Sequence, residues 1–472
     1  MGFPRDIFKK YDIRGLVGSE MTDELSFAIG QAFCSMIASE IGRAPTVAVG
    51  RDMRESSPAY EDALVRGFTS CGAQVLRIGL VSTPAFYFGV GHTGADAGVM
   101  VSASHNPAAY NGFKLTRAKA LPVSGENGIG ELAKIVLETS STASAGQPAE
   151  RRDVSTSPVE SRSLGRITDI EHIPALAARA EFAYAGSHPL KRFKIVADAA
   201  NGMGAQYLDE LFKLVDADVT RLYWDFDGSF PNHEADPFKE ENTADVQKKV
   251  VELGADIGIA TDGDGDRIFF VDDKGARVEP AVVRGMIAQI VLRSHPGATI
   301  CYDIRPGRVT EDMIREAGGV PSVTRVGHSL IKEQMIQVGA PFGGESSGHF
   351  FFHFPTGVYE GPLTVAAMLL QEMTRLNKPL SQIVGPLCTR YAHSGEMNFD
   401  VQDKEAVIAR LKEHYADGER NELDGVSITY PDFWFNVRGS NTEPKLRVNV
   451  EAIDRKTMEE KRQEIIEWIK RP

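Results

Sequence analysis

A five-residue pattern recurs along this chain at the spacing expected of duplicated domains. Residues 94–98 read Gly-Ala-Asp-Ala-Gly, and residues 254–258, 160 positions later, read Gly-Ala-Asp-Ile-Gly. A weaker third copy, Gly-Ala-Pro-Phe-Gly, occupies residues 339–343, although chance similarity between short Gly/Ala runs also explains this copy. Each copy precedes a polar loop, and open α/β sheets bind ligands at the loops that follow their strands. The repeat therefore predicts several similar α/β domains, each presenting one functional loop.

The first of these loops, residues 102–107, is called the serine loop. It follows the apolar run of residues 97–101, which is typical of a buried strand. Pro107 disfavours helical geometry at Asn106, so the chain is expected to continue as an open loop around Ser104. An isolated Ser/Asn/Pro sequence is more typical of an ordinary turn. The recurrence of the arrangement in other loops favours a functional serine.

The second loop, residues 262–267, is called the aspartate loop and lies between two strand-like runs. Its three carboxylates alternate along the chain and are expected on one side of a glycine-permitted turn: Asp262, Asp264 and Asp266. Carboxylates crowded in this way repel one another unless a cation neutralises them, and oxygen ligands suit Mg²⁺ or Ca²⁺. A helix-loop-helix calcium site is disfavoured, because its glycine and glutamate positions hold Arg267 and Asp273. A solvated acidic turn is the remaining alternative.

A further polar loop, residues 438–444, lies between strand-like runs at residues 433–437 and 446–450. It offers a guanidinium, two hydroxyls and an amide, from Arg438, Ser440, Asn441 and Thr442. Arginine forks onto phosphate oxygens, while hydroxyls and backbone N–H groups complete such a cradle. This composition favours a phosphate loop, with an ordinary hairpin turn as the alternative.

These loops, in this order, give the chain a family resemblance that covers essentially its whole length. The serine loop, the aspartate loop, Gly344 to His349 and the phosphate loop together resemble the α-D-phosphohexomutases, and among them the bacterial phosphomannomutase/phosphoglucomutase group. The resemblance implies an isomerase of carbohydrate metabolism that acts as an intramolecular phosphotransferase. It would interconvert the 1-phosphate and 6-phosphate of mannose, glucose or both.

The resemblance also implies roles around the reacting phosphate. Ser104 would carry the phosphoryl group, making the enzyme a phosphoprotein, and would hold one Mg²⁺ ion together with Asp262, Asp264 and Asp266. The remaining catalytic candidates are cationic or basic side chains that stabilise transferring phosphate: His105, Lys114, Arg14 and Arg267. Lys114 falls where the family places a candidate general acid/base, and burial near other cations is expected to lower its pKa.

By the same resemblance, residues 344–349 form a sugar loop whose Glu345 and Ser347 bind the O3 and O4 hydroxyls. The other implied substrate contacts are Tyr11, Arg305, His328 and His349, with the phosphate loop holding the phosphate that is not reacting: Arg438, Ser440, Asn441 and Thr442. Arg305 stands where the group is expected to have lysine, so the charge is kept but the geometry differs. Ser346, in the middle of the sugar loop, does not distinguish glucose from mannose.

The implied reaction has two steps. Phosphoserine gives its phosphoryl group to a hexose monophosphate, and the resulting bisphosphate turns around and returns its other phosphate. Glucose or mannose 1,6-bisphosphate would therefore act as an activator. Phosphoglucosamine mutase is an alternative within the family, and an Mg²⁺-dependent sugar-phosphate phosphatase is an alternative outside it. A non-catalytic sugar-phosphate sensor is disfavoured, because it would be expected to lose the serine or an aspartate.

The loops also divide the chain. We expect three similar mixed α/β domains followed by a smaller α+β C-terminal domain, arranged around a central cleft. Residues 1–165 would carry the serine loop and end in a mobile Ser/Thr/Ala-rich stretch at 138–163. Residues 166–277 would carry the aspartate loop, 278–387 the sugar loop, and 388–472 a lid with the phosphate loop.

Charge and cysteine content restrict the partners. The net charge of −13 over 472 residues disfavours a general nucleic-acid binder, so the expected partners are small sugar phosphates. No apolar stretch is long enough to cross a membrane, and the first residues resemble no signal peptide. The four cysteines fit no zinc or disulfide pattern, which favours the cytoplasm. We expect a monomer or a weak homo-oligomer.

Overall fold

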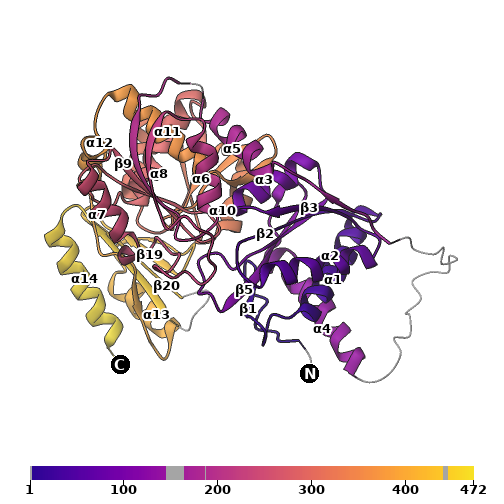
Figure 1. The fold of residues 1–472 in the computed structure, drawn as a ribbon. Coiled ribbons are helices and arrows are strands. Elements are labelled where there is room, and N and C mark those ends of the chain that lie inside the picture. The colour runs from indigo at the N-terminus through magenta and orange to yellow at the C-terminus, as the bar shows by residue number, and fades with distance from the viewer. Residues whose placement is uncertain (1–2, 145–163, 187, 440–444, 472) are drawn as a thin grey trace.

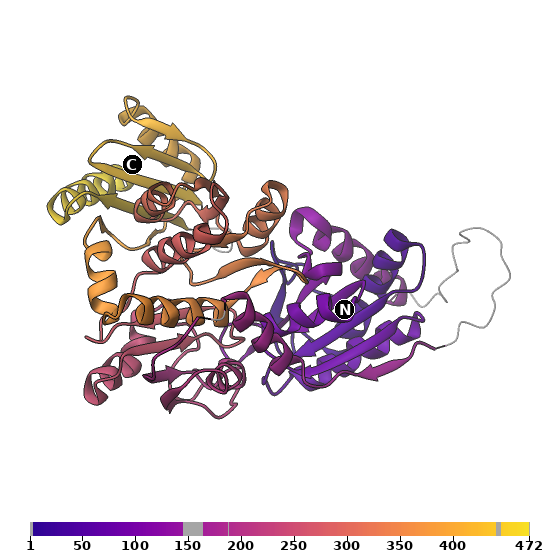
Figure 2. The ribbon, with the colours of Figure 1, turned by 90° about the horizontal axis from the view of Figure 1, so that it is seen from above.

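The computed structural model describes residues 3–144, 164–186, 188–439 and 445–471. Its strands form four sheets that follow one another along the chain (Figure 1). The first three sheets contain both parallel and antiparallel strands, and the fourth is antiparallel. This confirms the predicted order of three α/β domains and an α+β domain. Seen from above, the first domain (indigo) and the fourth (yellow) lie at opposite sides of the second and third (Figure 2).

The first sheet has the order β1-β5-β4-β2-β3-β6. Its strands are β1 (Ile13–Leu16), β2 (Thr46–Arg51), β3 (Gln74–Leu80), β4 (Ala97–Val101), β5 (Tyr110–Arg117) and β6 (Ile167–Asp169). Its helices are α1 (Asp23–Ile41), α2 (Ser57–Ser70), α3 (Thr83–Thr93) and α4 (Gly130–Ser144). Helix α3 begins where the Ser82 hydroxyl accepts a hydrogen bond from the backbone N–H of Ala85, as is usual at a helix N-terminus.

The second sheet has the order β10-β9-β7-β8, and the third β12-β11-β13-β14-β15. The second domain contains β7 (Phe193–Asp198), β8 (Ala217–Leu222), β9 (Ile257–Thr261), β10 (Ile268–Val271), α5 (Ile173–Tyr184), α6 (Gly204–Phe212) and α7 (Ala244–Leu253). The third contains β11 (Thr299–Asp303), β12 (Val320–Thr324), β13 (Phe342–Gly344), β14 (Phe350–Phe354), β15 (Gly357–Glu360), α8 (Pro280–Ser294), α9 (Arg308–Glu316), α10 (His328–Val338), α11 (Pro362–Leu376) and α12 (Leu380–Cys388).

The fourth sheet is antiparallel and includes the two strands that flank the phosphate loop. It contains β16 (Ala392–His393), β17 (Met397–Phe399), β18 (Glu419–Asn421), β19 (Val426–Thr429), β20 (Phe433–Gly439) and β21 (Leu446–Ala452), with helices α13 (Lys404–His414) and α14 (Arg455–Lys470). This domain packs around its own apolar core, whereas one larger core runs through the first three domains.

The repeated sequence pattern has a structural cause. Gly94, Gly254 and Gly339 each follow the last residue of a helix, α3, α7 and α10, and their φ angles are 67°, 59° and 66°. Glycine adopts this left-handed conformation at low cost, so it is favoured at helix ends. After each glycine comes a strand that pairs antiparallel with the next one: β4 with β5, β9 with β10 and β13 with β14. The serine, aspartate and sugar loops are therefore equivalent connections in three copies of one unit.

Two details differ from the predicted domain limits. Strand β6 pairs parallel with β3 of the first sheet, although the predicted boundary at residue 165 assigns it to the second domain. Residues 138–144 continue helix α4 rather than beginning a mobile stretch. The rest of that stretch, from residue 145 to 163, lies outside the described residues. Within the described part of the chain, no helix combines the length and apolarity that crossing a membrane demands.

Glu181, on α5, is a buried carboxyl group where the second domain meets the third. It accepts hydrogen bonds from the hydroxyl of Tyr207 and, at 2.9 Å, from the backbone N–H of Thr364 at the start of α11. Burial raises its pKa from 4.5 to about 7, against the lowering effect of these donors. The folded chain therefore retains a proton that the unfolded chain releases at lower pH.

We expect this proton to make the protein less stable as the pH rises. Between about pH 4.5 and 7 the free energy of unfolding should fall by up to about 3 kcal/mol, because only the unfolded chain ionises Glu181 freely there. The Glu181→Gln variant should lose this part of the pH dependence and keep the rest. Urea unfolding midpoints of both proteins, measured between about pH 5 and 8, check this, and identical pH slopes would contradict it.

Candidate active site

Ser104 lies in the connection between β4 and β5 and has a left-handed backbone conformation, with a φ of 52°. Such a conformation is uncommon for a residue other than glycine and needs support from its surroundings. Part of the support comes from Ser102, whose hydroxyl accepts a hydrogen bond from the Ser104 backbone N–H at 2.9 Å. The Ser104 hydroxyl is buried; it donates to Asp262 at 3.0 Å and lies 3.2 Å from Nδ1 of His105.

The aspartate loop brings its three carboxylates together, as the alternation predicts. Asp262, Asp264 and Asp266 are all buried, and one oxygen of each lies within 4.8 Å of the others. The loop also approaches the serine loop closely, since a Cβ atom at Gly263 would stand 2.6 Å from the carbonyl oxygen of Ser104. Glycine at this position therefore allows loops from two domains to meet.

The electrostatics of the cluster fit a divalent cation. Burial, and then the charges of Asp266 and Asp264, raise the pKa of Asp262 well above its ordinary value. One oxygen of Asp264 is buried and has no hydrogen-bond donor among the described residues. An all-oxygen set of three buried carboxylates with an unused lone pair suits a hard cation such as Mg²⁺ or Ca²⁺.

Lys114, on β5, contradicts one expectation from the sequence. Its ammonium group lies 2.7 Å from Asp264 and 2.5 Å from Asp266. Burial disfavours its charge, but these two carboxylates outweigh burial and raise the pKa of Lys114 well above its ordinary value. The predicted lowering of this pKa is therefore wrong for the arrangement seen here. Lys114 is a permanent cation beside the aspartates.

Two arginines hold the serine loop. Arg14, in β1, donates to the side chain of Asn106 at 2.5 Å and to the Ala103 carbonyl at 3.2 Å. Arg54 is buried and donates to four carbonyl oxygens along the loop and just after it, those of Ser104, Asn106, Pro107 and Tyr110. The sequence interpretation missed Arg54. Its position after β2, which runs parallel to β4, was the available signal, because parallel strands end at the same edge.

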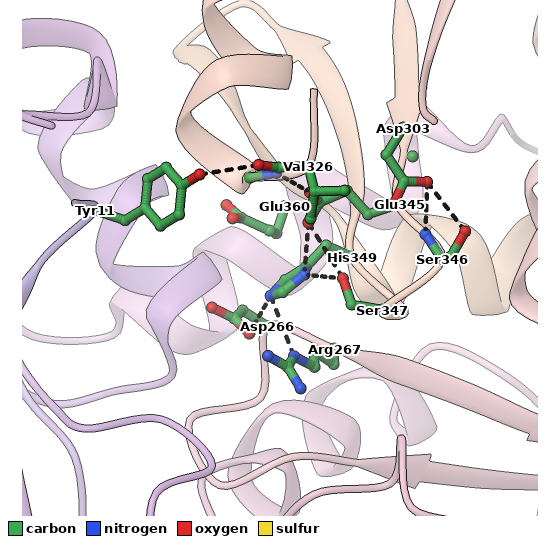
Figure 3. Close-up of polar contacts among 12 residues, drawn as sticks. Tyr11, Asp266, Arg267, Asp303, Val326, Glu345, Ser346, Ser347, His349 and Glu360 are labelled. Atoms are coloured by element: carbon green, nitrogen blue, oxygen red, sulfur yellow. Dashed lines mark hydrogen bonds and ion pairs between the residues drawn. The ribbon is translucent and has the colours of Figure 1, made fainter. Parts of the chain in front are cut away.

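The sugar loop connects β13 to β14 and joins the aspartate loop through His349 (Figure 3). The His349 ring lies 3.1 Å from Asp266 on one side and 3.1 Å from Glu345 on the other, with Ser347 at 2.9 Å. Burial disfavours a charged ring, yet these two carboxylates raise the pKa of His349 to about 9. A charged histidine therefore bridges the two loops and orients Glu345.

Tyr11 and His328 meet at the contact between the first and third domains. The Tyr11 hydroxyl donates to the carbonyl of Val326 at 2.9 Å (Figure 3). The Tyr11 ring lies 5.6 Å from that of His328. Gly327 has a φ of 143°, and its N–H donates to Glu345 at 2.8 Å. Burial, followed by the charge of Lys332, lowers the pKa of His328 well below its ordinary value. Its buried Nδ1 has no partner among the described residues, which leaves it available to a ligand.

Arg267 and Arg305 bring further positive charge to this region. Arg267 pairs with Asp236 at 3.1 Å, and its backbone N–H donates to Asp262 at 3.1 Å. Arg305 is buried, donates to Asp303 and lies 3.4 Å from the hydroxyl of Ser347. The structure thus places Arg305 beside the sugar loop.

Arg438, on β20, is buried in the fourth domain and pairs with Glu396. Its Nη1 atom has no acceptor among the described residues, so the guanidinium keeps an unused donor. Ser440, Asn441 and Thr442, the other predicted residues of the phosphate loop, lie outside the described residues. A cavity of about 760 Å³ is lined by residues of the second, third and fourth domains, among them Arg277, Arg305, Ser346 and Glu396. Ser104 and the three aspartates do not line it, and its lining has mixed charge, with four glutamates beside Arg277 and Arg305.

Together these residues form a site with two chemically different parts. One part holds a buried hydroxyl beside clustered carboxylates and cations, which is the environment that phosphoryl transfer needs. The other offers a carboxylate, hydroxyls and guanidinium groups, which suit a hydroxylated anion. Loops from the first three domains supply the hydroxyl, the clustered carboxylates and the sugar loop. Arg438 comes from the fourth domain.

Comparisons with known proteins agree along the whole chain. The sequence models described as phosphoglucomutase/phosphomannomutase, alpha/beta/alpha domains I, II and III, match residues 5–142, 171–275 and 282–391, and that family's C-terminal domain matches 396–467. A protein of Xanthomonas campestris named "Phosphohexose mutases" is 37% identical, over 97% of this chain and 98% of its own. A phosphomannomutase of Escherichia coli K12 is 34% identical over 94% of both chains.

Solved structures give the same result for the fold. The crystal structure of a phosphoglucomutase/phosphomannomutase family protein from Burkholderia thailandensis superposes with a TM-score of 0.86. That protein is 30% identical, and the match covers 99% of this chain and 98% of that one.

Proposed function

We propose that Ser104 carries the phosphoryl group in this chain, which belongs to the phosphoglucomutase/phosphomannomutase family. The chain is a phosphohexomutase, an isomerase that transfers phosphate intramolecularly. The observation that carries the proposal is the 3.0 Å contact between the Ser104 hydroxyl and Asp262. These residues are 158 positions apart and lie in different domains, so the fold must assemble the pair.

The proposed reaction has two transfers that use the same serine. In the first, the bond between phosphorus and Ser104 Oγ breaks as a bond forms to the free hydroxyl of a hexose monophosphate, and the hydroxyl proton ends on Ser104. The hexose 1,6-bisphosphate then turns around, and its other phosphoryl group returns to Ser104 as the proton moves back. Excluding water keeps phosphoserine from hydrolysis, and Ser104 is buried.

The residues around Ser104 stabilise the charge of the transferring group. Asp262, Asp264 and Asp266 would hold one Mg²⁺ ion, joined by an oxygen of the phosphoserine. When bound, Mg²⁺ supplies positive charge to the phosphoryl oxygens. Arg14 and Arg267 add cationic charge beside the serine and aspartate loops, and Lys114 keeps two of the aspartates paired. His105 lies within hydrogen-bond distance of the Ser104 oxygen and would orient it.

A single site must accept both orientations of the sugar, so the groups that bind it must be separate from Ser104. Glu345 and Ser347 would accept and donate hydrogen bonds to two ring hydroxyls, with Tyr11, His328 and His349 around them. Arg305 and Arg438, with Ser440, Asn441 and Thr442, would hold the phosphate that is not reacting. The unused Nη1 donor of Arg438 supports this assignment.

We propose mannose and glucose phosphates as substrates, with a 1,6-bisphosphate of either sugar as activator. Phosphoglucosamine mutase is the alternative within the family. A coupled assay that compares the 1-phosphates of glucose, mannose and glucosamine, with bisphosphate present, decides between them. Release of inorganic phosphate without formation of a 6-phosphate would instead favour a phosphatase.

We also propose a cytoplasmic enzyme that is a monomer or a weak homo-oligomer and binds no nucleic acid. All four cysteines are free thiols in the structure, and disulfides are uncommon where the compartment is reducing. The net charge of −13 is unfavourable for general contact with a phosphate backbone.

The Glu345→Gln variant should separate sugar binding from phosphorylation. Glutamine keeps the size of the side chain but loses the charge that pairs with His349, so we expect kcat/KM for sugar phosphate to fall about 10²-fold. Phosphorylation of Ser104 by a bisphosphate donor should remain measurable by intact mass, because Glu345 does not contact the serine loop in the described structure. Normal kinetics with every sugar phosphate would show that the sugar-loop assignment is wrong.

A further inference from the structure

Arg305 and Ser346 contact the same carboxylate, that of Asp303. Arg305 stands where the family is expected to have lysine, and Ser346 does not distinguish glucose from mannose. Asp303, at the end of β11, is fully buried. One of its oxygens accepts hydrogen bonds from the backbone N–H and the hydroxyl of Ser346, each at 3.0 Å (Figure 3). The other accepts from Nε of Arg305. The orientation of Arg305 and the conformation of the sugar loop therefore depend on the same side chain.

A second arginine shares this carboxylate. Arg284, on α8, has no exposed side-chain surface, and its Nη1 donates to the same Asp303 oxygen that Ser346 uses. Its Nε donates to the hydroxyl of Thr310 at 3.0 Å, and its remaining N–H groups reach the carbonyls of Gly344 and Pro306, both at 3.3 Å. Arg284 thus contacts the segment after Arg305 and the first residue of the sugar loop at once.

Two buried guanidinium groups converge on Asp303. Arg284 and Arg305 are both buried and both pair with Asp303, and the charges of Glu345 and Glu396 also stabilise the Arg305 guanidinium. An apolar side chain on α8 would avoid the desolvation of a guanidinium, so stability alone does not account for Arg284. Arg305 directs Nε to Asp303 and Nη2 to Ser347, and its Nη1 has no hydrogen-bond partner among the described residues. This unused donor suits an anion at the cavity that Arg305 and Ser346 line.

We propose that Arg284 is a positioning residue for substrate binding. Acting through Asp303, it fixes the guanidinium of Arg305 and the Ser346 turn, so that Arg305 meets the phosphate while Glu345 and Ser347 meet the sugar. This inference rests on the proposed function, because it assigns a binding role to Arg305. It adds a residue that never touches the substrate and that sets how tightly the substrate phosphate is held.

The test is steady-state kinetics of the full-length enzyme with glucose 1-phosphate and mannose 1-phosphate. Arg284→Met should raise KM about tenfold for both sugars and change kcat less than about threefold, since binding rather than transfer is impaired. Arg284→Lys keeps the positive charge but loses the planar guanidinium and its several donors, so it should give an intermediate KM. This variant serves as the test if Arg284→Met does not fold. The matched control is Val291→Ala, a buried change on α8 that should lower stability and leave KM unchanged.

A double-mutant cycle separates positioning from general damage. If Arg284 acts through Arg305, then Arg284→Met should add almost nothing to the KM increase caused by Arg305→Met. An unchanged KM in a folded Arg284 variant, or KM increases that multiply in the double variant, would overturn the inference. Neither result touches the proposed function, which fails separately if the wild-type enzyme makes no hexose 6-phosphate from hexose 1-phosphate or if the Ser104→Ala variant keeps full activity.

Discussion

Replacing Ser104 with alanine should lower kcat by at least about 10³-fold, because it removes the hydroxyl that we propose as the carrier of the phosphoryl group. The hydroxyl is buried and contacts Asp262 at 3.0 Å, so the substitution removes the proposed carrier oxygen and leaves the three aspartates in the sequence. The variant should also lose the mass increase that a bisphosphate donor gives the wild-type chain. A coupled mutase assay and intact-mass measurement check both results.

A control variant excludes a general effect of losing a serine. Ser70→Ala removes a hydroxyl at the end of α2, in the same domain but away from the serine loop, and should leave both activity and mass increase unchanged. The protein should keep its fold after Ser104→Ala, and alanine in the left-handed conformation should cost only about 1 kcal/mol. Full activity in Ser104→Ala would overturn the assignment of the phosphoryl carrier.

Replacing Asp264 with asparagine should raise the Mg²⁺ concentration needed for half-maximal activity by at least about tenfold and lower kcat about 10²-fold. One oxygen of Asp264 accepts hydrogen bonds from Lys114 and Thr83, and asparagine can keep this acceptor. The other oxygen has no donor among the described residues, and this is the atom that the amide group would replace. The substitution therefore removes a charge and a free lone pair with little change in shape.

Magnesium titration of mutase activity checks this prediction. Asp273→Asn is the matched control, since Asp273 lies just beyond the β10 strand and bonds to Ser381 rather than to the cluster. Its titration curve should match that of the wild type. An unchanged curve for Asp264→Asn would show that the aspartate loop does not hold the metal that the reaction uses.

The repeat and the loops could be predicted because their causes are local. Glycine at a helix end and carboxylates at alternate positions depend only on a few neighbouring residues, so both can be recognised in the amino-acid sequence. The assembly of the site follows from the same unit, since each functional loop is the same connection in its own sheet. The order of the domains therefore followed from the order of the loops.

The remaining features depend on partners far away in the chain. Lys114 is charged because Asp264 and Asp266, about 150 residues later, lie against it, and no local pattern around Lys114 indicates this. In the sequence Arg284 lies within a mostly apolar segment that is typical of a helix. Only the fold shows that Arg284 forms an ion pair with Asp303. Strand β6 was assigned to the wrong side of a boundary, because its short pairing with β3 is set by the sheet. Such long-range contacts decide charge states and positions that sequence spacing does not contain.

The most direct measurement follows a labelled phosphoryl group through the full-length enzyme. After incubation with Mg²⁺ and labelled hexose 1,6-bisphosphate, the chain should carry about one phosphoryl group, located on Ser104 by peptide mass spectrometry. A chase with unlabelled hexose 6-phosphate should move that label into hexose phosphates. Label on another residue, no label at all, or release of the label only as inorganic phosphate would contradict the account.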